Sequence, residues 1–409
     1  MDVEPADTAE GPLSDSDLAR SASTDPARIR RYEELGLIRR VDGAFERGDV
    51  NRVRLLVALE ESGIDLETLA AEVRDGRLSL GFAGEVVADS VGLTTTTHGR
   101  ALSELGLDGD FARRFQLALG LPTTAATDPI RQDDLELFAI VAGALEAGLE
   151  EDFLLGAMRV FGMSVRQIVE VQRELFRRNV EERLLGEGMG YPEMLEVSAE
   201  TRLKLQRLGY RTVFLLLRRF LEQAVFENLI ERLEETLEEH DITRSREEPA
   251  RTIAFLDLSG YTRLTEEAGD ACAAEHGGLL VEIALSRCAI TDGRVVKTLG
   301  DGVMLRFHEP EEAVVACLDI VARAEEAGLP PARAGIATGP VVQREADYFG
   351  RTVNLAARLV DAAGPGQVVV SESVVESAVG RVAFRSVGAP LLEGFRTPVS
   401  AFAASRAEG

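Results

Sequence analysis

The sequence predicts an α+β protein with a helical first part and a second part that mixes strands with helices. Its 409 residues are more than one hydrophobic core usually holds, so we expect two or three domains. Residues 75–235 follow helical patterning, whereas short β-type runs separated by helical stretches follow residue 251. This change of pattern predicts an all-α region followed by a domain in which strands and helices share one core.

The composition is typical of a globular protein, with 45% hydrophobic and 28% charged residues. No apolar run approaches the roughly 18 to 20 residues that span a bilayer, and the acidic start MDVEPADTAE lacks the apolar stretch of a signal peptide. We therefore expect a cytoplasmic protein with no membrane span. Its cysteines, Cys272, Cys288 and Cys317, are odd in number and lack metal-type spacing, which argues against disulfides and a zinc site.

The chain is strongly acidic, with a formal net charge of −25 from 45 basic and 70 acidic residues. Such a surface repels nucleic acid over most of its area. A polyphosphate substrate would need local neutralisation, either by metal ions or by a few well-placed cations.

Four segments follow one another along the chain. We expect residues 1–12 to form a disordered acidic tail and residues 13–235 to form a helical regulatory domain. The polar stretch 236–250 is typical of a linker, and the mixed domain occupies 251–409. Within the helical part, residues 13–74 resemble the winged helix-turn-helix of MerR-type regulators, above all in the stretch IRRYEELGLI.

The MerR-like stretch carries only a small positive excess. Nine arginines stand against six acidic residues between Arg20 and Arg54. Contact with a phosphate backbone requires a clearer cluster of basic residues. We therefore do not expect nucleic acid as a partner, and we favour a structural or dimerising use of this module.

The helical part ends in a segment with an apolar stripe. Residues 214–237 carry apolar side chains at three- and four-residue steps, which predicts an amphipathic helix that packs on a partner helix. His240 follows it and has two interpretations. We favour a solvated histidine stabilised by the helix dipole over a proton-responsive group that titrates at about pH 6 to 7.

Two aspartates of the mixed domain stand where predicted strands end. VVKTLGDGVML, residues 295–305, predicts a hairpin with Asp301 in its turn, and IAFLDLSGYTRL places Asp257 at the end of a strand. Ser259 and Gly260 follow at the start of a helix whose N-terminus could face phosphate. One such aspartate usually serves a turn or caps a helix. The pair favours a Mg²⁺ site, because Mg²⁺ is commonly held by one or two carboxylates together with substrate phosphates.

A third stretch, ADYFGRTVNLAARL, predicts a helix with Asn354 and Arg358 four residues apart. Their side chains then share one face, where an amide and a guanidinium can meet the same ligand. Taken alone, this spacing more often belongs to a solvated face.

Together these motifs resemble the class III nucleotidyl cyclases, in the bacterial subclass with a short arm. The matching pieces are FLDLSGYT, VVKTLGDGVML, ARAGIATGPVV, DYFGRTVNLAARL and LLEGFRTPVSAF. The resemblance implies a ferredoxin-like βαββαβ core with additions. It also implies an antiparallel homodimer in which each catalytic site takes residues from both protomers.

The resemblance assigns the metal and phosphate contacts to four residues. Asp257 and Asp301, with the backbone carbonyl of Leu258, would hold two Mg²⁺ or Mn²⁺ ions per site. Arg333 matches a position that contacts the terminal phosphates. At Glu393, where many members have lysine, a phosphate-contacting cation is missing, and either Arg396 or Arg333 could replace it.

The opposite protomer would supply the residues that read the nucleotide. Lys297 would contact the adenine ring nitrogen, and Asp347 would accept from its exocyclic amine; guanylyl cyclases of the family typically have Glu and Cys there. Asn354 would orient the ribose. Arg358 would stabilise the charge that grows on the α-phosphate in the transition state.

We therefore expect an adenylyl cyclase that converts ATP to 3′,5′-cyclic AMP and pyrophosphate. Its helical part resembles the regulatory domains of pH-responsive actinobacterial cyclases, some of which are autoinhibited, so the effector could be a proton, a lipid or another small molecule. The alternative is a MerR-like DNA-binding regulator whose cyclase-like domain only senses nucleotide. The complete set of catalytic residues argues against that alternative.

Overall fold

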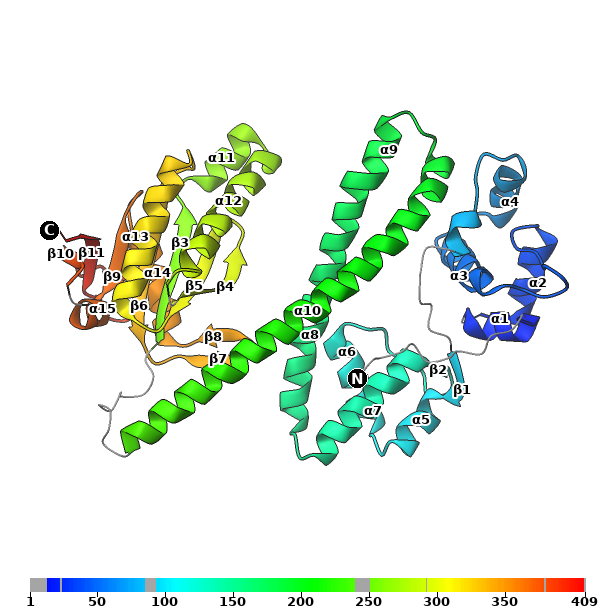
Figure 1. Ribbon diagram of the computed structural model, residues 1–409, viewed down its shortest axis with the longest axis horizontal. Helices are drawn as coiled ribbons and strands as arrows, with labels where there is room; N and C mark the ends of the chain where they lie inside the picture. The colour runs from blue at the N-terminus through cyan, green and yellow to red at the C-terminus, as the bar shows by residue number, and fades with distance from the viewer. Residues whose placement is uncertain are drawn as a thin grey trace. The chain divides into compact units, whose positions relative to one another are not determined.

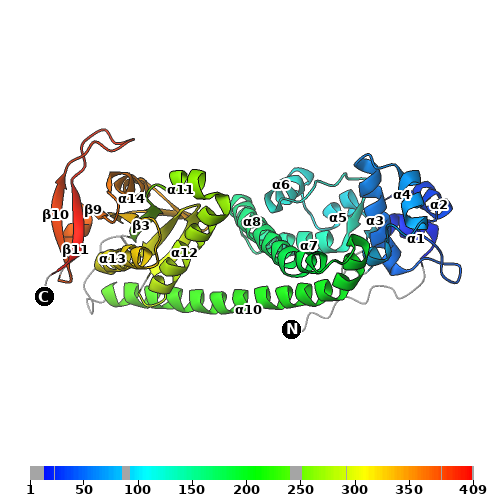
Figure 2. The same ribbon diagram turned by 90° about the horizontal axis from the view of Figure 1, so that it is seen from above.

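The computed structural model describes residues 13–22, 24–84, 93–239, 251–291, 293–378 and 380–407. The chain divides into two compact units, Met1–Glu231 and Arg232–Gly409. Helices make up most of the first unit, and the second combines helices with a sheet (Figures 1 and 2). The expected tail 1–12, His240 and most of the expected linker lie outside the described residues. No helix in the described part of the chain is both long and apolar enough to span a membrane.

The MerR-like stretch folds into four short helices around their own core. The helices are α1 (Asp15–Ser21), α2 (Pro26–Glu34), α3 (Arg47–Glu61) and α4 (Leu66–Arg74). Side chains cap three of their N-termini: Ser14 accepts from the backbone N–H of Asp17, and Asp25 and Asp65 do the same for α2 and α4. In the segment between α2 and α3, isolated bridges join Val41 to Ala44 and Phe45 to Leu13, which precedes α1. The resemblance of this stretch to the MerR-type helix-turn-helix stays a prediction.

The rest of the first unit is helical apart from one small sheet. Its elements are η1 (Gly81–Gly84), β1 (Leu93–Thr97), α5 (His98–Glu104), α6 (Gly109–Leu119), β2 (Pro129–Arg131), α7 (Gln132–Glu146), α8 (Glu151–Phe176), η2 (Arg177–Glu181), α9 (Glu182–Gly186) and α10 (Tyr191–Glu239). Strands β1 and β2 pair antiparallel, so the expectation of an all-helical region is wrong at this point. The reason is visible in β1, whose sequence LTTTT is rich in β-branched threonine.

Helix α10 is much longer than the predicted segment 214–237, because it begins at Tyr191 and spans 49 residues. Pro192 is tolerated there since it stands in the first turn. Gly209 does not break the helix either, although an internal glycine costs roughly 1 kcal/mol relative to alanine. The Nε2 atom of the Gln172 side chain, from α8, lies where a Cβ atom at Gly209 would stand, at 2.0 Å from it.

The second unit is built on one seven-stranded sheet. Its strands are β3 (Arg251–Leu258), β4 (Gly293–Leu299), β5 (Gly302–Phe307), β6 (Ala332–Gly339), β9 (Val368–Ser371), β10 (Val382–Gly388) and β11 (Ala401–Arg406), and its helices are α11 (Tyr261–Ala268), α12 (Asp270–Cys288), α13 (Pro310–Glu326), α14 (Arg351–Ala362) and α15 (Glu372–Ser377). The sheet order is β10-β11-β9-β6-β3-β5-β4. The part β6-β3-β5-β4 is antiparallel throughout and confirms the predicted ferredoxin-like βαββαβ core.

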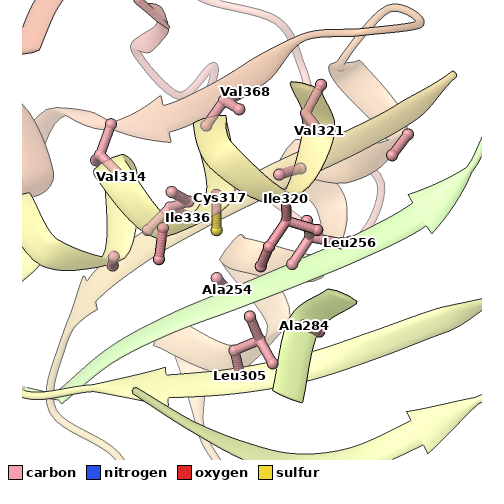
Figure 3. Packing of buried hydrophobic residues seen from close by; sticks show 14 of the residues in the cluster. Ala254, Leu256, Ala284, Leu305, Val314, Cys317, Ile320, Val321, Ile336 and Val368 are labelled. Atoms are coloured by element: carbon pink, nitrogen blue, oxygen red, sulfur yellow. The ribbon is translucent and has the colours of Figure 1, made fainter. Parts of the chain in front are cut away.

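Alternation along β3 creates two cores, one on each face of the sheet. Ala254 and Leu256 pack towards α12 and α13, where Figure 3 shows them beside Cys317 and Ile320. Ile253 joins the core beneath α14, on the opposite face. Because side chains alternate along a strand, Asp257 belongs to the α14 face. Cys272, Cys288 and Cys317 are free thiols.

The short hairpin of β7 (Val342–Arg344) and β8 (Asp347–Phe349) has no counterpart among the predicted strands. Its turn residues Glu345 and Ala346 both take positive φ angles, 51° and 61°. Hairpin turns of this kind are usually recognised by Asn-Gly or Asp-Gly, which is absent here. The hairpin matters because Asp347 is its first residue on the returning strand.

Candidate active site

The two predicted metal aspartates lie side by side at one end of the sheet. Asp257, near the end of β3, is paired in register with Gly302 of β5, and Asp301 immediately precedes Gly302 in the β4–β5 turn. Gly302 has to be glycine, because a Cβ atom there would lie 2.7 Å from the carbonyl oxygen of Leu256. The turn can therefore lie directly against β3, and this brings Asp301 to Asp257.

The electrostatics of Asp301 fit a cation site. Burial raises the pKa of the Asp301 carboxyl, and the negative charge of Asp257 raises it further, against the opposing effect of Arg333. Two carboxylates held close together are stabilised by a bound divalent cation. Leu258 is the buried last residue of β3 and could contribute only its backbone carbonyl.

The carboxylates do not form a complete protein cage. Among the described residues, no group of three or more His, Cys, Asp or Glu side chains could hold a metal ion. A pair of carboxylates fits Mg²⁺ or Mn²⁺ when substrate phosphates and water supply the remaining ligands. The donor set present is therefore suited to a metal that binds together with a nucleotide.

Arg333 occupies a place that the sequence did not predict. It stands opposite Asp257 in the β3–β6 register, and its Nε and Nη2 atoms donate to the two carboxylate oxygens of Asp257 at 2.7 and 3.0 Å. The hydrogen bond to Asp257 is the main reason why the pKa of Arg333 is raised. The arginine expected at the terminal phosphates is thus hydrogen-bonded to a predicted metal ligand.

Lys297 and Asp347 meet each other. Lys297 lies on β4 next to a register shift in its pairing with β5, and its Nζ atom donates to Oδ2 of Asp347. The other carboxylate oxygen of Asp347 accepts from the backbone N–H of Tyr348 at 2.8 Å. The structure therefore brings together the two side chains that the sequence assigns to the base.

Asn354 and Arg358 lie one turn apart on the outer side of α14, whose other side packs into the core through Val353 and Ala356. Arg358 contacts two carboxylates, Asp361 at 3.2 Å and Glu393 at 3.3 Å. The sequence did not predict the contact between Arg358 and Glu393. The signal for it was a glutamate at a position where many family members have lysine. Arg396 is exposed.

The predicted site residues make different ion pairs. Within the described residues, the ion pairs of Lys297 and Arg358 are with Asp347, Asp361 and Glu393, and not with Asp257 or Asp301. The ion pairs thus form two groups: Asp257 with Arg333, and Lys297 with Asp347.

Comparison with known proteins identifies the family. The profile described as the adenylate and guanylate cyclase catalytic domain matches residues 244–403. A relative from Mycobacterium tuberculosis, named uncharacterized protein Rv2212, is 33% identical over 373 residues, which are 86% of this chain and 89% of that protein. The chain belongs to the adenylate and guanylate cyclase family.

Two further relatives of this cyclase carry functional names. The adenylate cyclase of Streptomyces coelicolor is 28% identical over 290 residues, which are 68% of this chain and 71% of that protein. The pH-sensitive adenylate cyclase MT1302 of Mycobacterium tuberculosis is 38% identical over 129 residues, which are 31% of this chain and 32% of that protein. The solved adenylyl cyclase CyaB from P. aeruginosa covers 39% of this cyclase and 95% of its own chain, with 22% identity and a TM-score of 0.34.

Proposed function

We propose that this cyclase converts ATP to 3′,5′-cyclic AMP and pyrophosphate. The observation that carries the proposal is the contact between Lys297 and Asp347. A lysine donor and a carboxylate acceptor side by side complement the ring nitrogen and exocyclic amine of adenine. Guanine presents an N–H and a carbonyl at those positions, so both side chains would be left unpaired, which discriminates strongly. The names of the Streptomyces relatives support the same substrate.

Asp257, Asp301 and the backbone carbonyl of Leu258 would hold Mg²⁺ or Mn²⁺, two ions per site. Bound divalent cations would supply Lewis acidity towards the ribose 3′-hydroxyl and the phosphates. Asn354 would hold the ribose so that its 3′-oxygen faces the α-phosphate. The guanidinium of Arg358 would donate to the α-phosphate oxygens as negative charge develops on them.

We further propose that the active form is a homodimer, with each site shared between protomers. The resemblance to class III cyclases, in which each site takes residues from both protomers, supports a shared site. A second observation is the apolar surface of α10, where large hydrophobic side chains are exposed at helical spacing. These are Leu208, Phe214, Leu217, Phe220, Leu221, Val225, Phe226, Leu229 and Ile230. A soluble chain that leaves such a surface uncovered is prone to associate, and a second copy of the helix is the matching partner.

We propose that residues 13–235 regulate the catalytic domain 251–409 through α10 and the linker 236–250. A cavity of about 640 Å³ in the first unit supports a small-molecule effector. It lies between α5, α6 and residues 123–126, and the buried side chains of His98 and Gln116 line it. Such a volume is in the range of small-ligand sites. A proton or a lipid remains an alternative effector, and autoinhibition an alternative to activation.

The DNA-binding alternative is disfavoured by the charges of α2. Arg28 and Arg31 lie 3.3 and 3.1 Å from Glu60 of α3, and the hydroxyl of Tyr32 donates to the same carboxylate. Phosphate contacts would have to compete with these internal ion pairs. The helix that would face the groove is therefore largely neutralised within the fold.

The decisive experiment measures cyclic nucleotide formation by the purified full chain with Mn²⁺ and either ATP or GTP. We expect cyclic AMP from ATP and much less cyclic GMP from GTP. Asp301→Ala is the inactive control. No cyclic AMP above that control, across a pH series and several protein concentrations, would contradict the proposal.

A further inference from the structure

We propose that Arg333 is the resting counter-ion of Asp257 and has to release this carboxylate before a divalent cation can bind it. The guanidinium then becomes available to the phosphates of the nucleotide. This inference rests on the proposed function because it takes Asp257 to be a metal ligand. The new element is that metal binding and nucleotide binding depend on each other through Arg333.

The geometry of the pair leaves little room for a cation on Asp257. Both carboxylate oxygens accept a hydrogen bond from Arg333, from Nε at 2.7 Å and from Nη2 at 3.0 Å. A bidentate arginine–carboxylate pair is among the stronger charged contacts in proteins. The two side chains are only 26% and 28% exposed, so solvent screens them less than a surface pair. A divalent cation on Asp257 would stand a few ångströms from a fixed positive charge, which repels it.

The surrounding charges explain why arginine stands here without substrate. Asp257, Asp301 and Asp361 all raise the pKa of Arg333, with Asp257 contributing most. In the absence of a cation, Arg333 is the positive charge that offsets Asp257 and Asp301. A bound metal ion takes over that role and at the same time competes for the oxygens that hold the guanidinium.

The released guanidinium needs another anion. Asp361 of α14 also favours the charged form of Arg333, but it already pairs with Arg358 at 3.2 Å. A triphosphate offers several acceptor oxygens in the geometry that guanidinium groups prefer. Metal and nucleotide should therefore each strengthen the binding of the other. Without nucleotide, the enzyme should bind divalent cations weakly.

The test measures Mn²⁺ binding to the nucleotide-free full chain, by electron paramagnetic resonance of the free ion. We expect Arg333→Met to bind Mn²⁺ at least about fivefold more tightly than the natural chain, since it frees Asp257 from its partner. Arg381→Met is the matched control. It also removes one arginine from a pair of carboxylates, Glu311 and Glu312, and should leave Mn²⁺ binding unchanged. Equal or weaker Mn²⁺ binding by Arg333→Met would overturn the inference.

Two more variants separate the possible failures. Asp257→Asn should lose Mn²⁺ affinity; if it does not, Asp257 is no metal ligand and the proposed function fails at that residue. If Asp257→Asn loses affinity and Arg333→Met gains none, only the role of Arg333 is wrong. Should Arg333→Met fail to give the far-ultraviolet spectrum of the folded chain, Arg333→Lys carries the test. Lysine keeps the positive charge but cannot make the bidentate contact, so this variant should bind Mn²⁺ more tightly than the natural chain. Mn²⁺ binding no tighter than that of the natural chain would contradict the inference.

Discussion

Glu393 places a carboxylate oxygen 3.3 Å from the guanidinium of Arg358, the arginine assigned to the transition state. The contact joins the segment after β10 to the outer side of α14. Both side chains are largely solvated, at 40% exposed for Arg358 and 82% for Glu393, so the pair itself is weak. Its consequence is electrostatic, because the negative charge of Glu393 would compete with the phosphate contact that we propose for Arg358.

Replacing Glu393 by lysine should therefore raise activity. The substitution frees Arg358 from one partner and adds a cation near the phosphates, so we expect the KM for ATP to fall by about three- to tenfold. Glu393→Gln, which only removes the charge, should have a smaller effect in the same direction. The measurement is steady-state cyclic AMP formation at low and high salt. A raised KM in both variants would show that Glu393 positions Arg358 usefully instead of competing for it.

The pair formed by Lys297 and Asp347 predicts a loss of ATP use on double substitution. Lys297→Glu combined with Asp347→Cys removes the donor and the acceptor for adenine. We expect the rate with ATP to fall by about a hundredfold or more, because the buried polar groups of the base lose their partners. Light scattering checks that the oligomer is unchanged. An ATP preference equal to that of the natural chain would mean that other residues read the base.

We expect a substitution that removes the charge of Asp301 to have opposite effects on the stability of the fold and on activity. Its pKa is raised in the folded chain, by burial first and by Asp257 second, so the folded state holds the Asp301 proton more tightly than the unfolded state does. This contribution favours folding below the pKa of the unfolded chain and is lost as pH rises through the folded pKa. At neutral pH the ionised carboxylate therefore destabilises the metal-free fold.

Asp301→Asn should accordingly raise the melting temperature of metal-free protein at neutral pH and leave it nearly unchanged in acid. Activity should fall by about a hundredfold or more, since a metal ligand is lost. Differential scanning fluorimetry in chelator at several pH values provides the comparison. A lower melting temperature at neutral pH would mean that hydrogen bonds of the carboxylate outweigh its desolvation.

The sequence predicted the sheet core well because its strands have unambiguous patterns. Strands β3 and β5 are short apolar runs bounded by Gly, Asp and Ser, and the Asp-Gly turn between β4 and β5 is a strong signal. The β7–β8 hairpin was not predicted because its turn residues, Glu345 and Ala346, take positive φ angles although neither is Gly, Asn or Asp, the residues that usually mark such a turn. The start of α10 was not predicted because the segment was chosen by its apolar stripe, and the helix begins before it, at Tyr191.

The candidate site could be predicted as a set of residues but not as a set of contacts. Arg333 and Asp257 are 76 residues apart, and only the β3–β6 register places them face to face. Periodicity within a strand shows which face a side chain takes, but not which partner stands across. For that reason the sequence assigned Arg333 to the phosphates and contained no sign that it holds Asp257.

Helix α10 predicts a regulatory effect that depends on its rotation. It runs from Tyr191 to Glu239 through the boundary between the two units, so a change of its phase could reach the catalytic domain. If α10 is a two-state element that the first unit biases, the direction of its apolar surface has to matter. Inserting two residues after Arg232 turns the following helix by about 200°. Inserting seven turns it by about 700°, which restores the face to within roughly 20°.

We therefore expect the two-residue insertion to change the ratio of rates across a pH series by at least about fivefold, and the seven-residue insertion to change it far less. Both insertions lengthen the helix, so length alone cannot explain a difference between them. Circular dichroism should show both variants folded, because α10 continues beyond the insertion in either case. Equal rates and equal pH profiles in the natural chain and both variants would mean that the segment is a passive tether, and rotation of α10 would then play no part in regulation.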